Sequence, residues 1–121
     1  MKSAGNVFEV DKGGTLTLTD CKGSSSISHS DVEWGRGVLV SNGTFNMHGG
    51  EISGNEVSSM GGAVSSLDTF NMYGGSITGN TAQYFGGGVS VYKGTFNMFD
   101  GTISGNKVTS ATMQSHGGGG V

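Results

Sequence analysis

The chain has 121 residues, enough for one domain, with a net charge of −3 and 12% charged residues. No basic surface is therefore expected to hold nucleic acid through counterion release, and no apolar run approaches the roughly 20 residues of a membrane-spanning helix. Glycine accounts for 25 residues and proline is absent, which excludes collagen-like and proline-rich linker sequences. Because the glycines recur at fixed places inside an apolar repeat, an ordered chain is predicted.

The first predicted strands lie in VFEVDKGGTLTLTDC, residues 7–21, where apolar and polar residues alternate. The single cysteine, Cys21, allows no intrachain disulfide and is expected to be a buried, unreactive thiol. The segment that follows, residues 22–37, is the least regular part of the chain. Leu16 and Ile27 are 11 residues apart, whereas Phe45 and Ile52 are 7 apart, so about four residues are inserted there and are expected to loop out.

Three nearly identical copies follow: TFNMHGGEISGN (44–55), TFNMYGGSITGN (69–80) and TFNMFDGTISGN (95–106). Their phenylalanines are 25 and 26 residues apart, a spacing typical of a stacked repeat. The Gly-Asn pair that ends each copy is expected to form a corner, since both residues accept positive φ.

With the diverged first copy, the sequence predicts a single all-β repeat domain over residues 1–121, of about four coils. Each coil is expected to contain three short strands and three corners. The predicted coils cover residues 7–34, 35–60, 61–85 and 86–116, with the start of a fifth at 117–121.

The two-residue period of a strand predicts which side chains point inward. Equivalent residues should stack about 4.8 Å apart in columns. The asparagines Asn55, Asn80 and Asn106 should form a structural ladder at one corner, and Met60, in a turn, is a further inward candidate. The expected interior consists of Val38, Val40, Phe45, Met47, Ile52, Val57, Val64, Phe70, Met72, Ile77, Val89, Val91, Phe96, Met98, Ile103 and Val108.

These repeats resemble right-handed, single-stranded parallel β-helices of the pectate-lyase-like superfamily. More narrowly, they resemble the glycine-rich repeats of bacterial surface and autotransporter-like adhesins, in which units such as GTFNMxGGxISGN recur. The resemblance implies a secreted or cell-surface protein, with its export signal and anchor outside this chain. The same architecture serves enzymes, adhesins and passive stalks. The chain is expected to be cut from a longer array and to self-associate through its exposed coil ends.

One cluster could support catalysis: Asp31, Glu33 and Arg36, in the irregular segment. A glycosidase needs two carboxylates roughly 5 to 10 Å apart, whereas acids beside an arginine on a surface loop usually form a solvated ion pair. The sequence therefore predicts a non-catalytic stalk or adhesin. The alternative is a carbohydrate-active β-helix, a polysaccharide lyase or hydrolase, with its site at this cluster or in coils beyond this chain.

No metal or cofactor is predicted. Calcium-binding β-rolls place an aspartate in every nine-residue unit, whereas only Asp100 lies in a repeat corner here. The three histidines, His29, His48 and His116, share no column in which they could bind zinc.

The outward residues of the TFNM strands are the candidate ligand-binding surface, and Thr15, Thr17 and Thr19 extend it. They form the columns Thr44, Thr69 and Thr95; Asn46, Asn71 and Asn97; and His48, Tyr73 and Phe99. One interpretation is a hydrogen-bonded polar ladder that favours strands and keeps the face soluble. Another is a surface for a glycan or cell-surface ligand, with the aromatic column as a stacking platform. A third is ice recognition by threonine columns, although the asparagines and aromatics interrupt the array.

Overall fold

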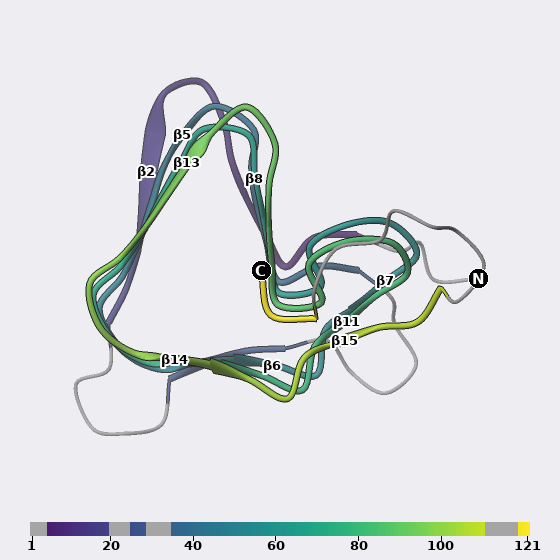
Figure 1. The fold of residues 1–121 in the computed structure, drawn as a ribbon. Helices are drawn as coiled ribbons and strands as arrows, with labels where there is room; N and C mark the ends of the chain where they lie inside the picture. Colours follow the sequence, from purple (N-terminus) through teal and green to yellow (C-terminus); the bar gives the residue numbers. More distant parts are fainter. Residues whose placement is uncertain (1–4, 20–24, 29–34, 111–118) are drawn as a thin grey trace.

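The computed structural model describes residues 5–19, 25–28, 35–110 and 119–121. These residues form a parallel β-solenoid, in which the chain winds repeatedly around one interior (Figure 1). Every described element is a β-strand, and every paired strand runs parallel to its neighbours in the next coils. The prediction of an all-β parallel solenoid is confirmed.

The strands form four sheets, each running along the axis of the solenoid. The first contains β1 (Phe8–Val10), β4 (Val38–Val40), β8 (Val64–Ser66) and β12 (Val89–Val91). The second contains β2 (Gly14–Leu18), β5 (Gly43–Met47), β9 (Thr69–Met72) and β13 (Thr95–Met98). The third contains β3 (Ser26–Ile27), β6 (Glu51–Ser53), β10 (Ser76–Thr78) and β14 (Thr102–Ser104). The fourth contains β7 (Glu56–Val57), β11 (Thr81–Ala82) and β15 (Lys107–Val108).

The number of strands per coil differs from the prediction. Each complete coil has four strands instead of three, because a two-residue strand follows each Gly-Asn corner. Two residues are too few for an alternating pattern to be visible in sequence. The described part of the chain contains three complete coils, against the predicted four, and an N-terminal coil represented by β1, β2 and β3.

The cross-section has two parts (Figure 1). The first three sheets enclose a three-sided lobe, and β7, β11 and β15 lead into a side arm that bends back toward the first sheet. Gly61 and Gly86 lie at this return, with φ of +69° and +52°. A Cβ on Gly86 would lie 2.0 Å from the Val89 carbonyl oxygen, so only glycine allows the arm to approach the sheet this closely.

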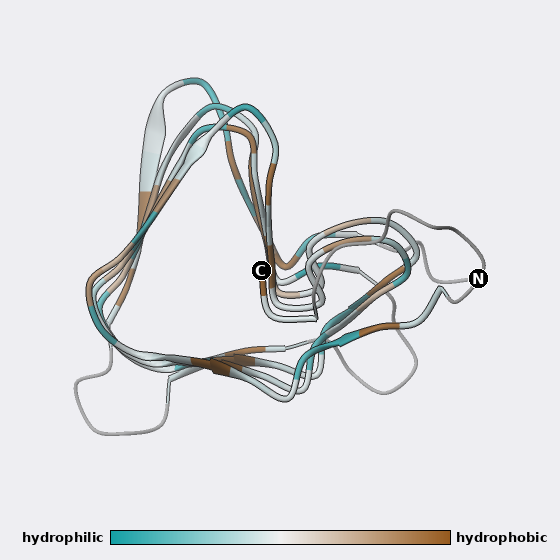
Figure 2. Ribbon diagram, viewed as in Figure 1, coloured by the Kyte–Doolittle hydropathy of each residue, from teal (hydrophilic) through white to brown (hydrophobic). Residues whose placement is uncertain are grey.

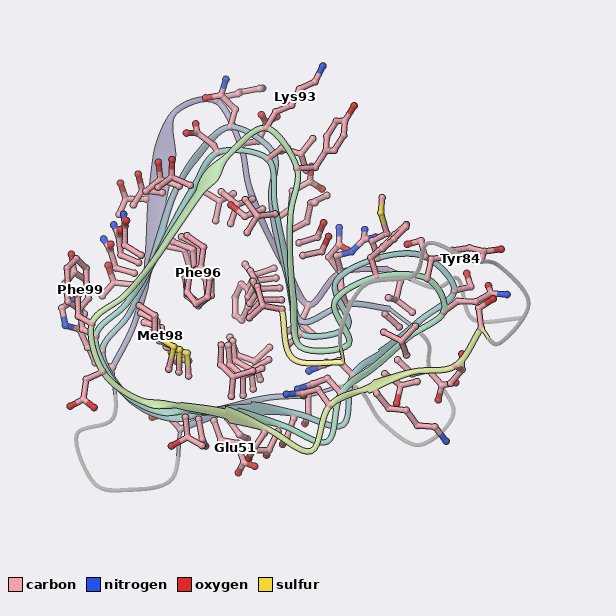
Figure 3. All side chains as sticks on the ribbon, in the orientation of Figure 1. Glu51, Tyr84, Lys93, Phe96, Met98 and Phe99 are labelled. Carbon is pink, nitrogen blue, oxygen red and sulfur yellow. The ribbon has the colours of Figure 1, made fainter. Side chains whose placement is uncertain are left out.

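The interior contains the predicted columns of apolar side chains. Phe45 and Phe70 stack at 5.0 Å between ring centroids, and Phe70 and Phe96 stack at 4.8 Å. Figure 3 shows Phe96 and Met98 pointing into the lobe, and Figure 2 shows hydrophobic segments on the strands that surround it. The fully buried members include Phe45, Met47, Ile52, Phe70, Met72 and Ile77.

Burial is lower in the last coil than predicted. Val91 is exposed, and 46% of the Met98 surface is exposed, because no described strand stacks beyond β13. Phe96, Ile103 and Val108 are half-buried for the same reason.

Three buried residues were not predicted to be inside: Ala63, Ala82 and Ser66. Ser66 occupies the column of Val40 and Val91, in the one turn that is a residue shorter than its equivalents. Its hydroxyl donates to the Asp68 carbonyl oxygen at 3.1 Å, which satisfies the buried polar group.

The predicted corner ladder is confirmed. The Asn55 Nδ2 donates to Asn80 Oδ1 at 3.0 Å, and the Asn80 Nδ2 donates to Asn106 Oδ1 at 2.9 Å. Asn80 also donates to the Ile52 carbonyl oxygen of the preceding coil, at 2.9 Å. The glycine of each Gly-Asn pair takes the positive φ, while Asn55 and Asn80 are buried inside the corner.

Candidate functional site

The candidate surface is the outward face of β5, β9 and β13. We call its nine residues the outer row: Thr44, Asn46, His48, Thr69, Asn71, Tyr73, Thr95, Asn97 and Phe99. Residues of equivalent sequence position are aligned from coil to coil, so the three predicted columns are present. Thr15 and Thr17 of β2 continue the threonine and asparagine columns into the N-terminal coil.

The asparagine column forms a hydrogen-bonded ladder. Asn71 Nδ2 donates to Asn46 Oδ1 at 3.0 Å, and Asn97 Nδ2 donates to Asn71 Oδ1 at 2.9 Å. A primary amide has two donor hydrogens and two acceptor lone pairs. Within the ladder Asn71 uses one of each, so one donor and one acceptor remain available to a ligand on the solvent side.

The aromatic column is stacked along the solenoid axis. His48 and Tyr73 are 4.6 Å apart between ring centroids, with an interplanar angle of 11°, and Tyr73 and Phe99 are 5.0 Å apart at 5°. Both faces of the Tyr73 ring are therefore covered by its neighbours. A sugar stacks on a ring face, so the side of this column offers only ring edges. Phe99, 66% exposed, has one face turned away from Tyr73 and is the best-placed ring for such a contact.

The possible catalytic cluster does not assemble within the described part of the chain. Asp31 and Glu33 lie outside the described residues. Arg36 does not face a carboxylate among the printed contacts of residues 5–19, 25–28, 35–110 and 119–121. Its Nη2 donates to Ser59 Oγ at 2.7 Å and to the Met60 carbonyl oxygen at 3.1 Å, and its Nη1 donates to Asn6 Oδ1 at 3.4 Å.

Arg36 therefore holds the base of the side arm against the first coils. Burial lowers the pKa of its guanidinium from the usual value. The other acid considered from sequence, Glu51, faces outward between Ser26 and Ser76, and its Oε1 accepts a hydrogen bond from Thr78 at 2.8 Å (Figure 3).

Several other predictions fall outside the described residues, namely those for Cys21, His29 and His116. Among the residues that the structure does describe, no group of three or more His, Cys, Asp or Glu side chains could hold a metal ion. The described residues also form no helix long and apolar enough to cross a membrane.

Sequence reasoning missed an open apolar pocket of about 490 Å³ where the side arm meets the first sheet. Its walls include Met60 and Phe85 from the arm, and Val91 and Tyr92 from the end of β12 and the turn after it. Met60 and Phe85 form a parallel bridge, so the arm also repeats in register. The apolar side chains beside the arm glycines were a signal, but their approach to Tyr92 depends on the bend of the arm.

No protein-family model, no curated protein and no solved structure matched this chain in the three comparisons made. Arguments about function therefore rest on the solenoid and on the residues that it leaves at the surface.

Proposed function

We propose that this chain is a non-catalytic repeat segment of a bacterial secreted or cell-surface β-helix protein, acting as a stalk that also adheres to a ligand. The proposal includes a right-handed β-helix of the pectate-lyase-like type, closest to the glycine-rich repeats of autotransporter-like adhesins. Its support is the repeated motif, in which Phe, Met, Ile and corner Asn residues serve coil-to-coil packing.

The observation that carries the proposal is the outer row. Its side chains repeat once per coil, as the strands do, at intervals of about 4.8 Å. The asparagine ladder keeps donors and acceptors toward solvent, and the threonines add hydroxyl groups beside it. A repeating row of small polar groups is suited to a ligand that also repeats, such as a glycan chain. Phe99 adds an exposed ring face at one end of the row.

The proposed partners are therefore a glycan of a host or cell surface and a second copy of this chain, joined through the coil ends. The proposed location is extracellular or at the cell surface. Catalysis has no role in the proposal, because the geometry gives the outer row hydroxyls and amides but no carboxylate.

A glycan array with the labelled 121-residue chain tests the proposal. We expect binding to at least one glycan class, and at least a tenfold loss of affinity in the double variant Thr95→Val and Asn97→Ala. Thr102→Val is the matched control, because Thr102 is an exposed threonine on β14, outside the outer row.

Two results would overturn the proposal. One is the absence of any glycan binding, or an equal loss of binding in Thr102→Val. The other is release of unsaturated or reducing sugar by the chain that Glu33→Gln abolishes, which would make the chain carbohydrate-active instead.

A further inference from the structure

The first and last described coils have strand edges of the same kind. β2 pairs with β5 on one side, and β13 pairs with β9 on one side; in the described residues neither has a strand on its other side. Apolar groups are exposed next to both edges, with 46% of Met98 exposed in the last coil and 44% of Phe8 in the first. An unpaired, apolar strand edge is a template for pairing with another chain.

The hydrogen bonds between coils show what the edge of β13 would accept. His48 N donates to Leu18 O at 2.8 Å, Tyr73 N donates to Met47 O at 2.7 Å, and Phe99 N donates to Met72 O at 2.8 Å. The next acceptor in this series is Met98 O, at the open edge. The residue that precedes His48 by one coil is Thr19, so Thr19 N of another copy is the matching donor.

Side chains match in the same alignment. Thr15, Leu16, Thr17 and Leu18 occupy the columns that hold Thr95, Phe96, Asn97 and Met98 in the last coil. A second β2 placed on β13 would therefore bring Leu16 onto the outer face of Phe96 and Leu18 onto Met98. Each pair would place apolar against apolar inside the lobe and threonine against threonine outside it.

One part of the open coil is already occupied. Gly88 N donates to Gly119 O at 2.8 Å, and Val89 N donates to Gly120 O at 2.7 Å. Val7 N and Phe8 N make the equivalent bonds to Arg36 O and Gly37 O in the first coil. Residues 119–121 thus lie where the start of another copy's β1 would otherwise pair with β12.

We propose that copies of this chain join head to tail, with β2 of one copy pairing with β13 of the next and β3 pairing with β14, in the register of the coils themselves. This specifies the self-association included in the proposed function. The occupied slot on β12 leaves the start of the incoming β1 unpaired. Because the two joining surfaces differ, the contact is heterologous and each copy leaves a further open end, so the product is a linear fibre.

Cysteine cross-linking tests the register. In a Cys21→Ser background, Thr15→Cys and Thr95→Cys would be combined in one chain and oxidised mildly. Aligned residues on neighbouring strands lie about 4.8 Å apart, within the range that a disulfide bridges. We expect a ladder of disulfide-linked oligomers on a non-reducing gel. The single variants can form dimers at most, and Thr17→Cys with Thr95→Cys, two residues out of register, should give little product.

Sedimentation provides a second measurement that needs no cysteine. Met98→Lys places a charge on the inward side of the open edge and should weaken association at least tenfold, whereas Thr95→Lys, outward on the same strand, should change it less than twofold. A monomeric chain at high concentration, or a ladder of equal yield from the out-of-register pair, would overturn the proposal. Neither result bears on glycan binding, which the array measures independently.

Discussion

The interior phenylalanine column allows a test in which one residue type occupies three environments. Phe70 is fully buried and stacks on Phe45 on one side and on Phe96 on the other. Phe96 is half-buried and stacks on Phe70 alone among the described rings. Phe99 is 66% exposed and stacks on Tyr73 outside the lobe. Replacing each by alanine removes the same atoms from a different setting.

The expected costs follow from burial. A buried Phe→Ala change costs about 3 to 5 kcal/mol, and Phe70→Ala should lie in the upper half because two stacked pairs are lost. Phe96→Ala should cost about 2 kcal/mol, since half of its surroundings is solvent and one stacked pair is lost. Phe99→Ala should cost about 0.5 to 1 kcal/mol, the contribution of one exposed stacked pair.

Urea unfolding followed by far-ultraviolet circular dichroism measures these differences, with unfolding free energies compared at low protein concentration. We expect the order Phe70, Phe96, Phe99, from most to least destabilising. A cost for Phe99→Ala equal to that for Phe70→Ala would contradict the assignment of an inside and an outside to the TFNM strand. So would a cost below about 1 kcal/mol for Phe70→Ala, because full burial alone contributes more than that.

Three further substitutions test the corners and the arm by the same unfolding measurement. Asn80→Ala removes a buried amide and leaves the Ile52 carbonyl oxygen without that donor, so a loss of about 3 kcal/mol is expected, against less than about 1 kcal/mol for Asn46→Ala in the solvent-facing ladder; equal costs would refute the distinction. Gly62→Ala should prevent folding, because its Cβ would lie 2.2 Å from the Gly87 carbonyl oxygen; a stable Gly62→Ala protein would disprove that contact. Arg36→Lys should cost about 1 to 2 kcal/mol and speed amide exchange in the arm, since lysine cannot reproduce the forked contacts; unchanged exchange would argue against an anchoring role.

Much of the fold could be predicted because the repeat states the same information three times. The spacing of Phe45, Phe70 and Phe96 set the length of a coil, and the period of two separated inward from outward residues. The corner asparagines were predictable because each follows a glycine at the same place in every copy. Agreement between local preference and repeat position is what makes such a sequence readable.

The errors have local physical causes. The strand Glu56–Val57 and its equivalents were missed because two residues carry no period, although they add the fourth sheet and lead into the arm. Ser66 was not expected inside, because only the bend of its shortened turn brings an acceptor to its hydroxyl. Met98 was expected to be buried, since a column pattern does not say which coil has a neighbour on both sides.

The candidate site was predictable in its membership and not in its chemistry. Sequence spacing placed His48, Tyr73 and Phe99 in one column, but not the orientation of the rings. Because the rings are nearly parallel and stacked along the axis, most ring faces are used in packing between coils. The polar groups of the neighbouring asparagine column are consequently the stronger basis for a ligand-binding proposal.

The central claim is that one parallel register runs through the coils and decides which residues face inward, outward and toward a second copy. Spin labels on cysteines at positions 44 and 69, in a Cys21→Ser background, test it most directly. Aligned residues on adjacent strands should be about 5 Å apart at the backbone, so low-temperature electron paramagnetic resonance should show strong dipolar broadening. The pair at positions 44 and 73, offset by four residues or about 13 Å along the strand, should broaden clearly less. With spin-diluted samples that exclude contacts between chains, equal broadening in the two pairs, or weaker broadening for positions 44 and 69, would contradict the account.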